Sequence, residues 1–136
     1  MRALLDTSVL VRYLTNDPPE LALAADQIIE REEELAVTPV ALAECGFVLT
    51  VRYGVSRPEA VDALLDLVQR TNLSVVGLET PLVAEALLLC RPSGRVSFAD
   101  ALIWAEARQT GHGVVYTFDR RFPRDGIELR DSVPAT

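Results

Sequence analysis

Short apolar runs alternate along the chain with longer segments in which apolar residues recur every three or four positions. The short runs have the length of strands, and they cover residues 2–5, 35–37, 73–78, 114–118 and 127–129. The longer segments have the periodicity of amphipathic helices, and they cover residues 7–14, 17–33, 39–51, 56–70, 80–90 and 97–111. Strands that alternate with helices predict an α/β fold, with a parallel sheet flanked by helices on both sides.

Two aspartates stand where a predicted strand ends. Asp6 follows the first apolar run and precedes Thr7 and Ser8, and Asp119 follows the run at 114–118. Open parallel sheets bind their ligands at the carboxyl ends of the strands. Each residue also has an ordinary structural role open to it, because Asp6 suits the N-cap of the following helix and Asp119 suits a turn.

Two further acids lie in predicted helices. Helical spacing places Glu44 on a face shared with Val40, Ala41, Phe47, Val48 and Val51. A carboxylate on such a face is costly to bury unless it is paired. Asp100 follows Ser97 by three residues at a helix start, which resembles a capping box with Asp in place of Glu or Gln.

The four acids could converge on one pocket above the sheet. Like charges about 4 Å apart repel by roughly 4 kcal/mol at an effective dielectric of 20, so such a cluster either raises its pKa values or holds a cation. Oxygen ligands favour Mg²⁺ or Mn²⁺ over zinc. A zinc site is further disfavoured, because one histidine and two distant cysteines offer no zinc-ligand spacing.

The order of these motifs resembles the PIN-domain ribonucleases, and in particular the VapC toxins of VapBC toxin–antitoxin modules. The resemblance covers nearly the whole chain and is carried by Leu5-Asp6-Thr7-Ser8, Ala43-Glu44, Ser97-Phe98-Ala99-Asp100-Ala101 and Tyr116-Thr117-Phe118-Asp119-Arg120-Arg121-Phe122. It implies a three-layer sandwich with a central, mostly parallel sheet of four or five strands. It also implies an endoribonuclease that depends on Mg²⁺ or Mn²⁺, cuts transfer or ribosomal RNA, forms a homodimer and is inhibited by a VapB-type antitoxin.

The resemblance matches Asp6, Glu44, Asp100 and Asp119 to the acidic quartet of that family, and Ser8 and Thr117 to hydroxyl positions that support it. Phosphodiester hydrolysis requires a neutralised phosphate, an activated water and an in-line geometry, which one or two divalent ions provide. We expect Asp6 and Asp100 to bind an ion directly. Glu44 and Asp119 would bind a second ion or orient the attacking water. Ser8 and Thr117 would fix carboxylate orientation, or would simply cap the first helix and close a turn.

The charge of the chain bears on its substrate. A net charge of −7 argues against general affinity for nucleic acid. All 13 basic residues are arginines, whose planar guanidinium makes forked phosphate contacts. Arg120 and Arg121 follow Asp119, and Arg12 lies on the helix after Asp6. These three could hold RNA phosphates or could be ordinary solvated surface residues.

Composition narrows the remaining possibilities. A chain of 136 residues that is 49% hydrophobic suits one domain over residues 1–136. Asp6 and Arg12 interrupt the first apolar run, and no later run reaches about 18 uncharged apolar residues, so we expect neither a membrane span nor a secretory signal. Two cysteines within helical segments suggest buried thiols and a reducing cytoplasm.

The same sequence argues against several other functions. The absence of lysine disfavours a haloacid dehalogenase-type phosphatase, a phosphoacceptor receiver domain and a P-loop nucleotide binder. The alternative to an enzyme is a catalytically inactive PIN-like scaffold that acts through protein–protein contacts. The presence of all four acids argues against that alternative.

Overall fold

The structure is a computed structural model that describes residues 2–135. Its strands are β1 (Ala3–Leu4), β2 (Leu35–Val37), β3 (Leu73–Val75), β4 (Val114–Tyr116) and β5 (Glu128–Arg130). Its α-helices are α1 (Thr7–Thr15), α2 (Pro19–Arg31), α3 (Pro39–Phe47), α4 (Arg57–Val68), α5 (Thr80–Leu89) and α6 (Phe98–Thr110). A π-helical turn, η1 (Val48–Arg52), continues α3. The predicted alternation of strands and helices is confirmed.

All strand pairs are parallel, as expected of an α/β fold. In the first sheet β2 lies between β1 and β3, with Leu35 opposite both Ala3 and Leu73. In the second sheet β4 pairs with β5. The five strands are therefore divided between a sheet of three and a sheet of two. To form one sheet, an edge strand of the first sheet would have to pair with a strand of the second. One of these edge strands, β1, is only two residues long.

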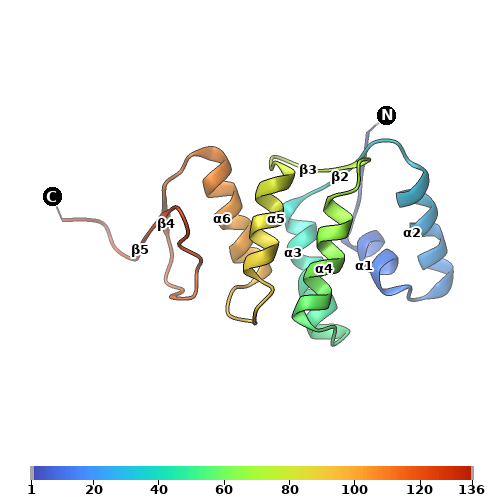
Figure 1. Ribbon diagram of the computed structural model, residues 1–136, viewed down its shortest axis with the longest axis horizontal. Helices are drawn as coiled ribbons and strands as arrows, with labels where there is room; N and C mark the ends of the chain where they lie inside the picture. The colour runs from blue at the N-terminus through green and yellow to red at the C-terminus, as the bar shows by residue number, and fades with distance from the viewer. Residues whose placement is uncertain (1, 136) are drawn as a thin grey trace.

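The helices follow one another across the molecule (Figure 1). In that view α4, α5 and α6 stand side by side, β2 and β3 run across the upper ends of α4 and α5, and β4 and β5 lie beyond α6. Helix α3 packs against both α1 and α6, so it links the two ends of the molecule. Within residues 2–135, no helix combines the length and the apolar character that a membrane crossing requires.

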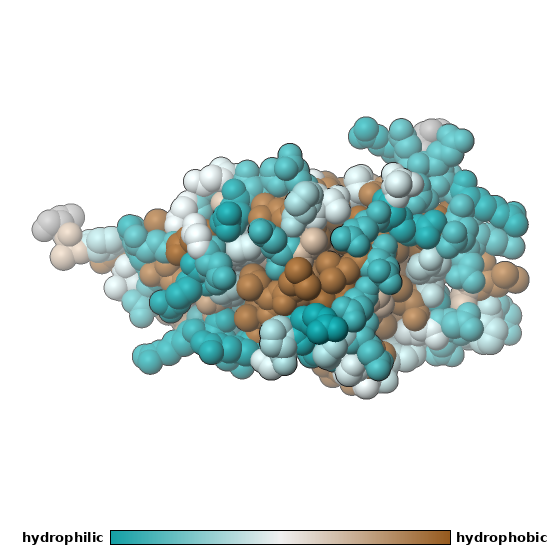
Figure 2. Space-filling model, in the orientation of Figure 1, coloured by the Kyte–Doolittle hydropathy of each residue, from teal (hydrophilic) through white to brown (hydrophobic). Residues whose placement is uncertain are grey.

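The core is built from aliphatic side chains on the inner faces of these helices and on the first sheet. Its largest fully buried members include Leu10, Ile29, Leu42, Leu64 and Leu87. Figure 2 shows that apolar surface also gathers over α4 and α5 in the middle of one face. Both cysteines are free and buried, and burial raises the pKa of Cys45 to about 12 and that of Cys90 to about 11. The prediction of buried thiols is confirmed.

Helices α3 and α6 approach each other closely where Gly46 meets Phe98. A Cβ atom at Gly46 would lie 2.6 Å from the Phe98 ring. The Arg57 guanidinium packs on the same ring, 4.6 Å from its centroid, and donates hydrogen bonds to the carbonyls of Cys90 and Val96 at 3.1 and 2.8 Å. The first turn of α6 is thereby fixed against α3 and α4. That turn also carries Asp100.

Candidate functional site

Asp6 lies between β1 and α1, as its place in the sequence predicted. It is the N-cap of α1, and its Oδ2 accepts hydrogen bonds from the backbone N–H of Ser8 at 3.2 Å and from Ser8 Oγ at 2.7 Å. The Ser8 hydroxyl, followed by the Ser8 N–H, lowers the pKa of Asp6. The carboxylate is exposed and ionised at neutral pH. The capping role and a metal-binding role are therefore compatible, because one oxygen remains free.

Glu44 is exposed on the surface of α3, so the expectation that it is buried is wrong. Three of the five apolar residues expected around it are exposed too, namely Val40 by 74%, Phe47 by 52% and Val51 by 63%, whereas Ala41 is buried. The buried side of α3 consists of Ala41, Leu42, Cys45 and Gly46, of which all but Leu42 are small. The helix turns these residues inward because α6 approaches closely there. Glu44 and Asp6 line one cavity of about 610 Å³.

Asp100 and Asp119 form a second acidic pair. Asp100 lies at the start of α6, where Ser97 Oγ accepts a hydrogen bond from its backbone N–H at 3.0 Å, so the predicted cap is confirmed. Partial burial, followed by the nearby negative charge of Asp119, raises the pKa of Asp100. Asp119 takes the opposite shift, because the backbone N–H and the guanidinium of Arg121 lower its pKa. The two carboxylates are thus close enough to compete for one proton.

The loop after β4 sets the position of Asp119. Thr117 Oγ1 accepts a hydrogen bond from the Asp119 backbone N–H at 3.0 Å, so Thr117 closes the turn and does not hold the carboxylate. Asp119 Oδ1 accepts from the Arg121 backbone N–H at 2.8 Å and from Arg121 Nε at 3.3 Å. Arg121 is therefore occupied as a partner of Asp119, which leaves it less free for a phosphate.

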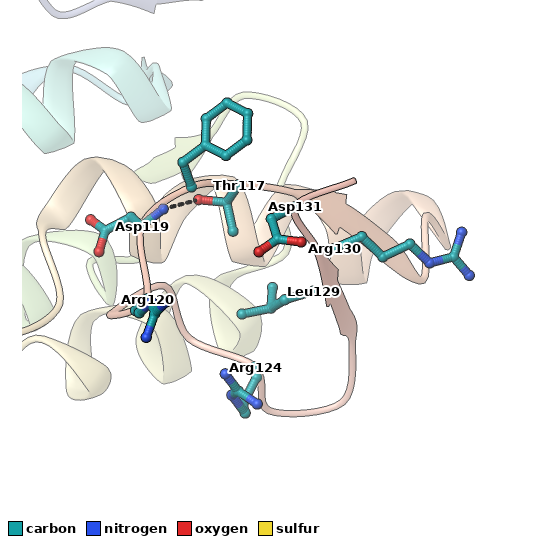
Figure 3. A pocket seen from close by; sticks show the side chains of 8 residues that line it. Thr117, Asp119, Arg120, Arg124, Leu129, Arg130 and Asp131 are labelled. Carbon is teal, nitrogen blue, oxygen red and sulfur yellow. Dashed lines mark hydrogen bonds between the residues drawn. The ribbon is translucent and has the colours of Figure 1, made fainter. Parts of the chain in front are cut away.

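A cavity of about 310 Å³ lies beside this loop. Figure 3 shows Arg120 and Arg124 on one side of it, while the guanidinium of Arg130 points away. The carboxylate of Asp131, a residue that the sequence did not single out, lies in the same pocket near Thr117. Arg120 remains available to bind a phosphate near Asp119.

The structure brings the four predicted acids together as two pairs. Asp6 and Glu44 come from the α1 and α3 side, whereas Asp100 and Asp119 come from α6 and the loop after β4. Between residues 2 and 135, no three His, Cys, Asp or Glu side chains gather closely enough to hold a metal ion unaided. No three of the predicted carboxylates among residues 2–135 form the expected cluster, and β4, which precedes Asp119, pairs with β5 in a sheet other than that of β1.

The comparison with known families decides what this fold is. The PIN domain family matches residues 3–126. The chain belongs to the PIN-domain family. PIN domains are in general metal-dependent nucleases. A search of curated proteins found no match to this PIN domain.

The residues present fit a hard divalent cation. Mg²⁺ keeps several waters and is commonly bound by one or two carboxylates together with substrate phosphates. Each acidic pair of this PIN domain supplies two carboxylates, and all of these donors are oxygens. The competition of Asp100 and Asp119 for a proton is the electrostatic condition that a cation relieves. Asp100 with Asp119, and Asp6 with Glu44, are the groups that would hold such ions.

Sequence reasoning missed three residues of the Asp6 and Glu44 cavity in this PIN domain. Phe47, Arg52 and Tyr53 line it beside the predicted Arg12. Phe47 was expected to be an apolar residue of the helix face, and Arg52 and Tyr53 follow the predicted helix. These three residues meet at one cavity because of the π-helical turn η1. The spacing of apolar residues along the sequence does not reveal such a turn.

Proposed function

We propose that the protein is an endoribonuclease that depends on Mg²⁺ or Mn²⁺ and serves as the VapC-type toxin of a toxin–antitoxin module. The observation that supports it most is the Asp100 and Asp119 pair, in which the pKa of Asp100 is raised by burial and by the charge of its neighbour. The second pair, Asp6 and Glu44, lines a cavity that also contains arginines. Acidic pairs beside cationic side chains suit a phosphodiester substrate and its metal ions.

Hydrolysis forms a bond from a water oxygen to phosphorus and breaks the bond from phosphorus to the ribose oxygen that leaves, which gains a proton. A bound divalent ion supplies charge neutralisation and lowers the pKa of a coordinated water. The chain itself contributes orientation. Ser8 holds one oxygen of Asp6 in place, and Arg121 holds one oxygen of Asp119. Arg12 and Arg120 are available for RNA phosphates, which would be those of transfer or ribosomal RNA.

Incubation of the purified protein with total cellular RNA tests the proposed activity. We expect cleavage at discrete positions with Mn²⁺ or Mg²⁺, and none with EDTA. A single-stranded DNA of the same sequence as a cleaved RNA, run alongside, identifies the class of nucleic acid. Intact RNA under every metal condition, with a protein that remains folded, would contradict the proposal.

Thermal unfolding offers a test that does not need a substrate. Because an ion that binds only the folded state stabilises it by mass action, millimolar Mn²⁺ should raise the melting temperature of the wild type. Asp100→Asn should abolish most of that rise. In EDTA near neutral pH the same variant should be at least as stable as the wild type, since it removes a repulsive charge. A variant that loses stability in EDTA yet keeps the Mn²⁺ shift would contradict the assignment.

The sign of the expected pH dependence follows from the pKa of Asp100. The folded-state pKa lies above its ordinary value of 3.8, so the folded protein binds the proton more tightly than the unfolded chain. The contribution of Asp100 to stability is therefore largest below pH 3.8 and falls as the pH rises through the folded-state pKa. Asp119 contributes with the opposite sign, because its pKa is lowered. Thermal unfolding of Asp100→Asn in EDTA, followed from pH 3 to 7, should show its advantage over the wild type growing with pH.

We further propose that α2 contacts the antitoxin or a second copy of the chain in a homodimer. Leu21 and Ile28 lie seven residues apart on one face of α2 and are exposed by 53 and 37%, whereas the exposed Leu23 lies on another face. The adjoining face of α2 is buried through Ala22, Ala25 and Ile29. An apolar helix face of this kind suits an amphipathic peptide that lies in a groove beside it. Such a pairing would be expected in the cytoplasm.

One observation favours the alternative of an inactive scaffold. The acids are divided between two pairs, and no three metal-binding side chains gather among residues 2–135. A scaffold would act through protein–protein contacts alone and would need no cation. The RNA incubation separates the two functions, since a scaffold leaves the RNA intact with every metal.

A further inference from the structure

The cavity beside Asp6 and Glu44 combines two aromatic rings with two guanidinium groups. Its volume of about 610 Å³ falls within the roughly 300–1,000 Å³ typical of ligand pockets. The Phe47 side chain is 52% exposed and that of Tyr53 is 39% exposed, although both rings are large and apolar. Arg12 and Arg52 line the same cavity. Exposed rings next to arginines form the surface on which unpaired nucleotides bind.

The π-helical turn η1 is what places Arg52 and Tyr53 in this cavity. The Tyr53 N–H donates to the Val48 carbonyl five residues earlier, at 3.1 Å, instead of four residues earlier as in an α-helix. A continued α-helix would carry Arg52 around the axis, away from the face of Glu44. The wider turn takes in an extra residue and brings Arg52 back to that face. Insertions of this kind occur frequently at functional sites.

The positions of Tyr53 and Arg12 are defined by their contacts. The Tyr53 hydroxyl donates to Asp17 Oδ2 at 3.0 Å, which holds the ring at the cavity edge. Arg12 Nε is buried, and no acceptor for it exists within residues 2–135. This Nε is closed to solvent, so a ligand would contact the outer nitrogens of the Arg12 guanidinium, on a residue that is only partly buried. Phosphate oxygens are the natural partners of an arginine fork.

We propose that this cavity binds one unpaired nucleotide of a single-stranded RNA segment, with its base on Phe47 and Tyr53 and its phosphate on Arg12 and Arg52. The proposal rests on the proposed nuclease function and names the form of its substrate. The occupant is a nucleotide because Phe47 and Tyr53 are the most exposed apolar residues of the lining and four charged side chains border them. A base inside a duplex does not present its face, so the segment must be unpaired.

Binding of a short fluorescein-labelled oligoribonucleotide to the full chain in EDTA separates recognition from cleavage. Phe47→Ala and Tyr53→Ala should each weaken binding on the order of ten-fold, since each removes an aromatic ring on which a base stacks. Phe47→Tyr keeps its ring and should bind like the wild type, whereas Tyr53→Phe keeps the ring but loses the hydrogen bond to Asp17 and should bind more weakly than the wild type but more tightly than Tyr53→Ala. Val40→Ala, a matched control on the exposed side of α3 but outside the cavity, should have no effect.

Two further readouts report stacking and phosphate contact directly. An oligoribonucleotide with 2-aminopurine should lose fluorescence on binding to the wild type, and this quenching should disappear with Phe47→Ala. Arg12→Ala and Arg52→Ala should each reduce the salt dependence of binding, by a slope of about 0.7 per lost phosphate contact. Arg31→Ala, an exposed residue of α2, should leave the slope unchanged.

Several results would overturn the proposal. Wild-type affinity in folded Phe47→Ala and Tyr53→Ala variants would do so, and so would the absence of any RNA binding by the wild type. A change in oligomeric state on size-exclusion chromatography, with unchanged RNA binding, would assign the rings to contact with a second copy. If the wild type cleaves RNA with a metal ion but the two alanine variants bind RNA as tightly as the wild type, the nucleotide pocket is refuted and the nuclease function stands. Stacking as expected, without cleavage by the wild type, would refute the nuclease and leave the pocket.

Discussion

Asp6→Asn should lower metal-dependent RNA cleavage by more than about 100-fold while the protein stays folded. Loss of groups that merely orient a metal ligand commonly costs 10–100-fold, so loss of a ligand charge should cost more. The fold should survive because Asn is as good an N-cap as Asp and can accept the same hydrogen bonds from Ser8. Initial rates of cleavage in Mn²⁺ and the melting temperature in EDTA measure the two effects separately.

Asp66→Asn is a matched control for this change. Asp66 lies on the exposed side of α4, outside both acidic pairs, and its substitution removes the same charge. It should leave the cleavage rate within about two-fold of the wild type, since an isolated surface charge contributes little to an ion that binds elsewhere. If Asp6→Asn cuts RNA as fast as Asp66→Asn, then Asp6 has no part in the reaction.

Gly46→Ala should destabilise the protein by about 1–3 kcal/mol, because the added methyl group overlaps the Phe98 ring. The new Cβ would lie 2.6 Å from two ring atoms of Phe98. Alanine would otherwise stabilise a helix by about 0.5–1 kcal/mol relative to glycine, so the overlap must outweigh this gain. Arg57 also packs on the ring, which restricts its movement away from α3. Urea unfolding measures the loss.

A double-mutant cycle isolates the contact between Gly46 and Phe98. Phe98→Ala alone should cost about 3–5 kcal/mol, since it empties a buried position. In that background Gly46→Ala no longer meets a ring, so it should be neutral or should stabilise the protein by about 0.5 kcal/mol. An equal loss from Gly46→Ala in both backgrounds would show that the overlap does not limit this position.

The sequence predicted those features that depend on neighbouring residues. Asp6 was expected at a strand end and at a helix N-cap, and it occupies both positions because the two requirements concern adjacent backbone. Ser97 and Asp100 were expected to begin a helix, and the hydrogen bond between them is formed. Trp104, one turn later in the same helix, lies in the core and is 2% exposed.

Features that depend on distant packing were not predicted. Glu44 was expected to be buried because apolar residues share its face. The side of α3 that is buried is instead the one that carries Gly46, whose small size allows the contact with α6. The π-helical turn that places Arg52 in the cavity has no periodic signature. The division into two sheets likewise depends on which strand edges meet, and local sequence does not encode that.

The location of a bound metal ion tests the central claim most directly. Crystals of the protein grown with Mn²⁺ and measured for anomalous scattering would show each ion as a distinct peak. We predict a peak bonded to carboxylate oxygens of Asp100 and Asp119. At Asp6 and Glu44 we predict either a second peak or contact with the same ion. Fully occupied Mn²⁺ elsewhere on the surface, with both acidic pairs empty, would contradict a metal-dependent nuclease built on these four acids.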